Sequence, residues 1–487
     1  MLISSSHSSR TLAAAPPVAS PRPAEPTLAQ WQDIVSPLPG HGDLVEIGKR
    51  RDEAGFVSID DVRERVAALD YHAIDPYVAS VAGSIGGERI EIPKGERSVE
   101  VFAPGHYAEG VEVLMGTHNG PGAPMMVILP GIHSTGESSS HTNVFRKMAL
   151  ERGMNYVVLP NSLSKVMLED KPHYHPGNPR ADAEASHEIL AQLKATYPEF
   201  FAQISVGGYS YGALHGANLV RFDEEQDERL INGSMVGVSP PENLEHSMRQ
   251  LDGLREKYAE GAGSIPTTGL KYRNQVKKYG YERFPESDLA GRGPGTNITE
   301  IKIADKYGSR DGLMEMIEIV DTEFGHNQLP KNTQEYKDAG WWERRKLRQQ
   351  HDQQVENFTY QLFSDGWMVN DRWLDERDMT PAEMSERYSF SEAIEAIEDT
   401  PVLTLISADD YILAPQDVEA LRDLESSSGD LEVIRVMDHG GHVGLSWNPE
   451  VQETLADFAV GAHLKARVES NAPAQAPSAS ARIPALA

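Results

Sequence analysis

Short runs of apolar residues alternate with longer amphipathic segments over most of this chain. The runs MMVILPG, YVVLPNS, ISVGGYS, MVGVSP, VLTLISADD and LEVIRVMD are rich in Val, Ile and Leu and have the length of strands. Helical spacing of apolar residues follows at about 142–152, 181–196, 211–221, 416–424 and 450–464. Strands that alternate with helices in this way predict a mostly parallel central sheet flanked by helices.

The pattern changes at two places. The early runs RIEIP, VEVFAP and VEVLMGTH are separated by short turns, which predicts an antiparallel edge before the parallel strands. From 241 to 399 the spacing is helical, as in LEHSMRQLDGLREKY, and strand-like runs are few. We interpret this segment as a large helical cap, or lid, inserted before the strand VLTLIS. Four of the six tryptophans fall in it and form either the core of the cap or a substrate pocket: Trp341, Trp342, Trp367 and Trp373.

Both ends of the chain are rich in Ser, Ala and Pro and lack periodicity. We therefore expect a disordered arm at 1–30 and a disordered tail at 466–487. The core is then formed by 31–240 together with 400–465. A signal peptide at the N-terminus is the competing interpretation, but no basic region precedes LAAAPPVAS and Pro16-Pro17 interrupts its apolar stretch. We expect a cytoplasmic rather than a secreted protein.

Charge and composition exclude several classes of protein. The chain of 487 residues has 45 Lys and Arg against 74 Asp and Glu, a net charge of −29. Such a balance repels a phosphate backbone, so nucleic acids and anionic membranes are not expected partners. No apolar run approaches the roughly 18 residues of a membrane helix, so no integral membrane segment is expected. The absence of cysteine excludes disulfides, thiol nucleophiles and Cys-ligated metals, but leaves the compartment open.

The motif that carries chemistry is Gly208-Tyr209-Ser210-Tyr211-Gly212, which matches Gly-x-Ser-x-Gly. The match alone is weak, but ISVGG precedes it as a strand and YGALHGANLV follows it as a helix, which is the setting that the pattern requires. Glycines two residues to either side allow a tight, strained turn between strand and helix. Ser210 is therefore the candidate nucleophile.

A serine hydroxyl needs an imidazole base held by a carboxylate before it becomes a good nucleophile. The candidates follow two later strands: Asp409 and Asp410 after VLTLIS, and His439 and His442 after LEVIRVM. His442 is preferred because Gly441 and Gly444 bracket it and let the loop bend toward the serine. Asp410 is preferred because the apolar pair and proline after it align with the usual acid loop.

A developing oxyanion needs two backbone N–H donors. The amide of Tyr211 directly follows the nucleophile. The second is expected in the loop Pro130-Gly-Ile132-His-Ser-Thr-Gly136, which turns sharply after the strand MMVILP. We assign it to the amide of Ile132. An ordinary strand-to-helix turn is compatible with the same residues.

These residues, in the order Ser, Asp, His, resemble the α/β-hydrolase superfamily over roughly 89–464. GGHVG around His442, the loop LPGIHSTGESS, and YHPGNPRADAEA ahead of the nucleophile strand look like a lipase/esterase-like subgroup with its base in Gly-Gly-His-x-Gly. The chain departs from that subgroup in having Pro130 where His is usual, and in its larger insertion. The resemblance implies an α/β-hydrolase fold with the cap inserted before the acid-bearing strand.

The leading hypothesis is a serine hydrolase that cleaves a small-molecule or lipid carboxylic ester through an acyl-enzyme. An acyltransferase on the same fold and a non-catalytic interaction protein are the alternatives, and the oligomeric state stays open. No cofactor or metal is expected. His173-x-His175 lacks a third ligand at a diagnostic spacing, and the glycine-rich 291–295 lacks the Lys-Ser/Thr ending of a phosphate loop. The basic cluster near Arg344 is interpreted as a solvated helix face.

Overall fold

The computed structural model describes residues 59–69, 76, 79–80, 90, 92–132, 134, 136, 139–164, 166–167, 172–259, 334–347, 350, 359–361 and 371–470. The predicted N-terminal arm lies outside these residues. The C-terminal helix α21 (Pro449–Ser470) continues past 466, where the predicted tail begins, and the rest of that tail is not described. Among the described residues, no helix has both the length and the apolar character needed to cross a membrane.

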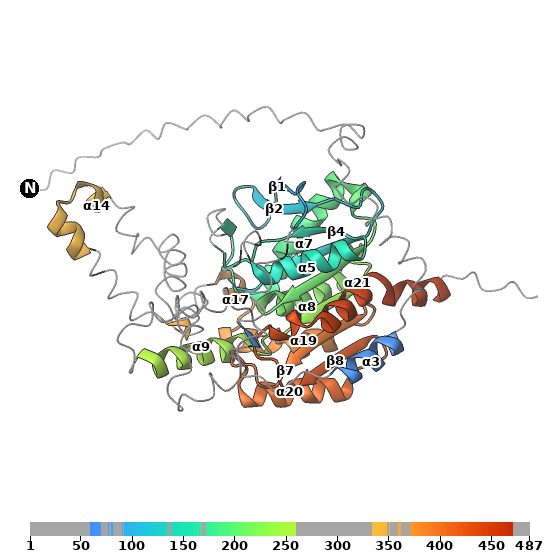
Figure 1. The fold of residues 1–487 in the computed structure, drawn as a ribbon. Coiled ribbons are helices and arrows are strands. Elements are labelled where there is room, and N and C mark those ends of the chain that lie inside the picture. Colours follow the sequence, from blue (N-terminus) through green and yellow to red (C-terminus); the bar gives the residue numbers. More distant parts are fainter. Residues whose placement is uncertain are drawn as a thin grey trace, which may run out of the picture. The chain divides into compact units, whose positions relative to one another are not determined.

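Eight strands form one sheet in the order β1-β2-β4-β3-β5-β6-β7-β8. The sheet is antiparallel between β1 and β2 and between β2 and β4, and parallel from β4 to β8. The strands are β1 (Arg97–Val101), β2 (Val111–Gly116), β3 (Met125–Leu129), β4 (Asn155–Val158), β5 (Ile204–Tyr209), β6 (Met235–Val238), β7 (Val402–Ser407) and β8 (Glu432–Met437). This order, with helices on both faces (Figure 1), is that of the α/β-hydrolase fold and confirms the predicted fold class.

The antiparallel edge was predicted one strand too long. The run RIEIP has no strand structure at its described residues Ile90, Ile92 and Pro93. Proline has no N–H to donate to a neighbouring strand, which weakens pairing at the end of this run. Within the part of the chain that the structure describes, the antiparallel edge therefore consists of β1 and β2.

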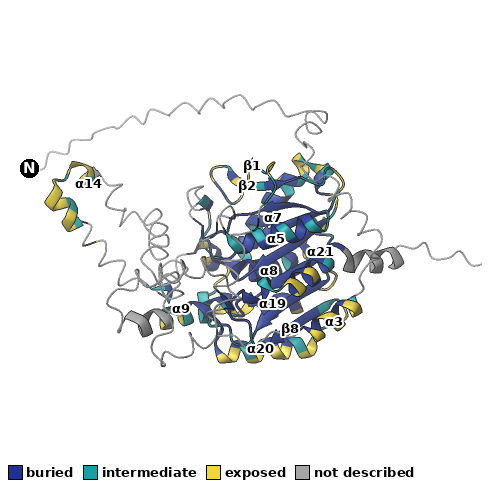
Figure 2. Ribbon diagram, in the orientation of Figure 1, coloured by how far each residue is buried: buried dark blue, intermediate teal, exposed yellow. Residues whose placement is uncertain are grey.

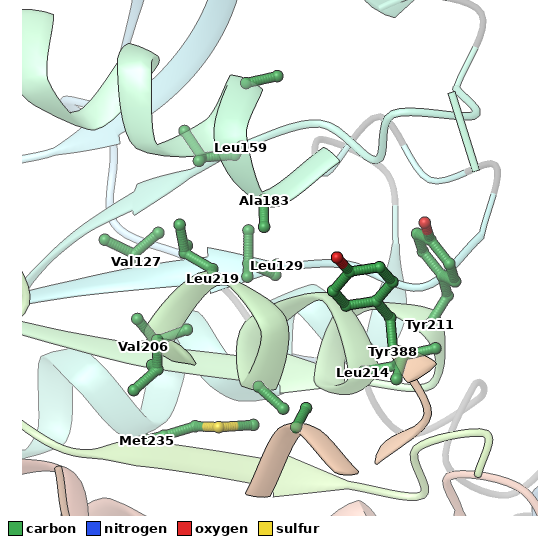
Figure 3. Close-up of a cluster of buried hydrophobic side chains, with 14 of the residues drawn as sticks. Val127, Leu129, Leu159, Ala183, Val206, Tyr211, Leu214, Leu219, Met235 and Tyr388 are labelled. Atoms are coloured by element: carbon green, nitrogen blue, oxygen red, sulfur yellow. The ribbon is translucent and has the colours of Figure 1, made fainter. Parts of the chain in front are cut away.

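Successive residues of the central strands serve two different cores because side chains alternate across a sheet. In β3, Val127 belongs to one buried cluster and Ile128 to the other. Figure 2 shows the resulting buried sheet, and Figure 3 shows part of the first cluster, in which Leu219 lies near Val127 and Leu129. The first cluster is covered by α7 (Pro179–Thr196), α8 (Tyr211–Glu224), α19 (Phe390–Glu395) and α20 (Pro415–Ser427). The second is covered by α3 (Ile59–Ala68), α5 (Ser140–Glu151) and α21.

The described residues between β6 and β7 form helices and connecting loops, and no strands. The helices include α9 (Leu244–Ala259), α14 (Gln334–Asp338), α17 (Arg372–Asp375), α18 (Pro381–Arg387) and α19, and residues 341–347 are helical as well. Residues 260–333 and 362–370 of this segment lie outside the described part. The limits of the cap at 241 and 399 stay a prediction. Within these limits, α19 packs against α8 of the core.

Candidate active site

Ser210 lies on the turn between β5 and α8. Its φ of 54° and ψ of −135° place a non-glycine residue in a sparsely populated backbone region. A Cβ atom at Gly208 would collide with the carbonyl of Gly212, and one at Gly212 with the carbonyl of Leu129. Both glycines are therefore required for β5, α8 and β3 to approach as closely as they do. The turn leaves the hydroxyl of Ser210 at the carboxyl edge of the sheet.

Three predicted residues meet at this edge. The Oγ atom of Ser210 lies 2.8 Å from Nε2 of His442, and Nδ1 of the same imidazole lies 2.8 Å from Oδ2 of Asp410. All three side chains are buried. Asp410 also accepts a hydrogen bond from the amide of Ile412 at 3.1 Å, which helps to hold its carboxylate toward the imidazole. The arrangement is a continuous hydrogen-bonded chain from hydroxyl to carboxylate.

The rival candidates Asp409 and His439 pair with each other and do not contact Ser210. His439 Nδ1 lies 3.4 Å from Asp409, and the histidine side chain is 43% exposed. Asp409 instead accepts a hydrogen bond from the amide of Gly441 at 2.8 Å. Partial burial raises the pKa of Asp409. Asp409 therefore braces the loop that carries His442.

A second brace of this loop was not predicted from the sequence. Ser239, the residue after β6, has a left-handed φ of 49°, and Val443, the residue after His442, has one of 62°. The hydroxyl of Ser239 accepts a hydrogen bond from the amide of Val443 at 3.1 Å. The preceding Gly441 is also left-handed, and a Cβ atom there would collide with the carbonyl oxygen of Pro76. The strained backbone of Val443 on one side of His442 and the close approach of Gly441 to Pro76 on the other limit how far the imidazole can shift.

The predicted oxyanion residues lie beside the serine. Ile132 and Tyr211 line the same pocket as Ser210. A Cβ atom at Gly131 would stand 3.1 Å from the Cβ of Ser210, so the loop after β3 passes next to the nucleophile. The two residues assigned as amide donors are thus brought together with the hydroxyl.

A buried carboxylate, that of Asp182, accepts a hydrogen bond from the side chain of Tyr211. Asp182 of α7 accepts hydrogen bonds from the phenol of Tyr211, the hydroxyl of Ser162 at 2.6 Å and the amide of Gly177. Burial raises the pKa of Asp182 to about 6, although hydrogen bonds from Ser162 and Tyr211 oppose the shift. Sequence reasoning missed this residue because an Asp in the first turn of a helix is most simply explained by the helix dipole.

The pocket beside Ser210 is largely apolar, and α9 contributes much of its wall. Its lining residues are Ile132, Ser210, Tyr211, Pro241, Leu244, Ser247, Met248, Leu251, Tyr360, Ile412 and His442. None of the three described tryptophans of the cap lines it. Trp373 is buried against Tyr388 and Arg377, whereas Trp341 and Trp342 are 63% and 73% exposed. The pocket-lining interpretation is wrong for these three, and Trp367 lies outside the described residues.

The other polar clusters that the sequence singled out make contacts within the protein where the structure describes them. Within the part of the chain that the structure describes, no group of three or more His, Asp or Glu side chains is arranged to hold a metal. His175 of the discounted His-x-His pair lies 3.6 Å from the buried Asp371. Arg344 of the basic cluster donates to the carbonyls of Tyr336 and Lys337. The glycine-rich 291–295 lies outside the described residues.

Comparisons with known proteins found no matching family model and no matching curated protein. Solved structures with similar chain traces include the Pyrococcus furiosus esterase Pf2001, at 14% identity and a TM-score of 0.37, covering 80% of this chain and 96% of that one. Carboxylesterase CesB from Bacillus subtilis matches at 12% identity and 0.38, covering 81% and 96%. An esterase from Pyrobaculum calidifontis matches at 12% and 0.38, covering 83% and 97%. These scores are low, so it is the order of the strands and the turn at Ser210 that identify the fold of this chain as that of an α/β-hydrolase.

Proposed function

We propose that this protein is a serine hydrolase that cleaves carboxylic esters through an acyl-enzyme intermediate. The observation that carries the proposal is the hydrogen-bonded chain from Ser210 through His442 to Asp410 at the mouth of an apolar pocket. A hydroxyl, an imidazole and a carboxylate in this order are the components of nucleophilic acyl transfer. The motif Gly440-Gly-His-Val-Gly444 supports affiliation with the lipase/esterase-like subgroup.

In the first half of the reaction, Oγ of Ser210 attacks the ester carbonyl carbon while its proton passes to Nε2 of His442. Asp410 accepts the Nδ1–H hydrogen bond, which keeps Nε2 free to receive the proton and stabilises the imidazolium. The carbonyl oxygen becomes an oxyanion facing the amides of Ile132 and Tyr211. The C–O bond to the alcohol then breaks, and the alcohol leaves with the proton from His442.

In the second half, His442 removes a proton from water, and the hydroxide attacks the acyl carbon bound to Ser210. Collapse of the second tetrahedral intermediate breaks the bond to Oγ, and the serine regains its proton from the imidazole. The acid is released. An acyltransferase would differ only in accepting an alcohol or amine in place of water, so the ratio of transfer to hydrolysis with added acceptors separates the two activities.

The test combines covalent labelling with turnover. A fluorophosphonate should label Ser210 of the wild type, and nitrophenyl esters should be hydrolysed. Ser210→Ala should stay folded, lose the label and lower kcat/KM by about a thousandfold or more, because the nucleophile and its base act as one unit. Folded wild-type protein that takes no label, or an alanine variant that keeps most of its turnover, would overturn the proposal.

A further inference from the structure

The helix α9 faces the reactive groups with one side. Its residues in the pocket recur at intervals of three and four, which is the spacing of a single helix face. They are Leu244, Ser247, Met248 and Leu251. The same pocket contains Ser210 and His442, so a substrate group seated against this face lies next to the proposed nucleophile.

Ser247 is the polar member of this face. It is 4% exposed, and its Oγ atom has no hydrogen-bond partner among the described residues. Its backbone amide donates to the carbonyl of Asn243 at 3.1 Å, as in any helix, but the hydroxyl makes no comparable bond to the turn before it. A buried polar group without a partner costs about 1–3 kcal/mol, so such a group needs an explanation.

The surroundings of Ser247 do not supply a partner. The other pocket-lining residues of α9 have aliphatic or thioether side chains, and the hydroxyl of Ser210 is already bonded to His442. No Asp, Glu, Lys or Arg is found among the described residues that line the pocket. A charged substituent would therefore be buried there without a counter-ion, which is strongly unfavourable. A neutral group able to hydrogen-bond fits both observations.

We propose that Ser247 is a specificity-determining residue whose hydroxyl donates a hydrogen bond to a neutral polar substituent, a ketone, on an otherwise apolar acyl group. The inference rests on the proposed function, because the pocket receives an acyl group only if Ser210 is the nucleophile. Sites built to bond a polar substituent reject the analogue that lacks it, since their own buried group is then left unpaired. The preferred ester is thus a functionalised acyl ester rather than a plain alkanoate.

The experiment compares nitrophenyl esters of straight-chain acids with their keto analogues, the ketone placed at successive carbons. Each ester is measured for kcat/KM with the wild type, Ser247→Ala and Ser247→Thr. The wild type should prefer at least one keto ester by about tenfold, which corresponds to about 1.4 kcal/mol. Ser247→Ala should abolish this preference by lowering kcat/KM for the keto ester about tenfold relative to kcat/KM for the plain alkanoate. Ser247→Thr keeps the hydroxyl and should retain part of the preference.

A matched control is available on α18. Ser385 is also 4% exposed but does not line the pocket, so Ser385→Ala should keep the wild-type preference. Equal turnover of keto and plain esters by the wild type would overturn the proposal, as would a folded Ser247→Ala that keeps the preference or slows both esters alike. Absence of both fluorophosphonate labelling and ester turnover would instead contradict the proposed function. Failure of the proposed function and failure of the Ser247 inference are therefore distinguishable.

Discussion

The strand ends of the core position the reactive side chains of the site, whereas the segment between β6 and β7 contributes side chains to the wall of the pocket. At the strand ends, Ser210, Asp410 and His442 each follow a strand of the parallel part of the sheet, and 2.8 Å hydrogen bonds join them. The pocket-lining face of α9, in contrast, lies on a helix of the segment between β6 and β7, which contributes no strand to the sheet among its described residues. The position of the reacting atoms is thus set by the rigid sheet, and the shape of the pocket by an attached helix.

Polar contacts attach that segment where it leaves and re-enters the core. Glu242, just before α9, accepts hydrogen bonds from the amide and the hydroxyl of Ser391 at 3.1 and 2.9 Å. His246 of α9 lies 2.6 Å from the buried Asp417 of α20. These contacts join the two stems of the segment to each other and to the core. The comparison therefore predicts that changes at the strand ends alter the rate for every ester, whereas changes on α9 alter the preference among esters.

The largest effect is expected at the acid. Asp410→Asn should lower kcat by about a thousandfold, because an amide no longer selects the tautomer of His442 that can accept the serine proton. Asp409→Asn should cost less than about tenfold, since an Asn oxygen can still accept the Gly441 amide. Both variants are measured with a short and a long ester. The reverse ranking would assign the acid to Asp409.

A smaller and selective effect is expected from Met248→Ala. Removing this side chain takes contacts away from an acyl chain against α9, which should lower the ratio of kcat/KM for hexanoate over acetate by about tenfold. Met384→Ala on α18 is the matched control, because Met384 is equally buried but does not line the pocket. An unchanged ratio in folded Met248→Ala would show that the acyl group lies elsewhere.

The smallest effect is expected at the stem, in stability rather than in rate. Burial raises the pKa of Glu242 from 4.5 to about 7, and the charge on Asp417 adds to the shift. A carboxyl with a raised pKa keeps a proton that the unfolded chain releases, so its contribution to stability falls as the pH rises from 4.5 through about 7. Glu242→Gln should remove this loss. Above pH 7, its free energy of unfolding should exceed that of the wild type by about 1 kcal/mol or more.

Urea unfolding on both sides of that pH window measures the difference between Glu242→Gln and the wild type. Glu419→Gln at an exposed position of α20 is the matched control for the loss of one carboxylate, and the pH dependence of Glu242→Gln is compared with it. A Glu242→Gln variant whose stability relative to the wild type does not vary with pH would contradict the expected titration at the stem.

Local pattern in the sequence was sufficient for the elements that form the core. Apolar runs and helical spacing predicted β3 to β8 and the helices α5, α7, α8, α20 and α21. The Gly-x-Ser-x-Gly match predicted the turn at Ser210, because larger side chains at its two glycines would collide with neighbouring backbone. The edge of the sheet that carries the site could be predicted, because parallel strands joined by helices have their carboxyl ends at one edge. Ser210, Asp410 and His442 were expected at that edge for the same reason.

Contacts between distant parts of the chain were decided only by the tertiary structure. The apolar spacing of α9 is visible in the sequence, but that it faces Ser210, and that Trp341 and Trp342 do not, depends on where the helices dock. The bond from Val443 to Ser239 and that from Tyr211 to Asp182 likewise join segments that no local motif connects. The sequence by itself determined which residues could react, through short-range geometry, and the packing of remote elements decided what braces them and what they face.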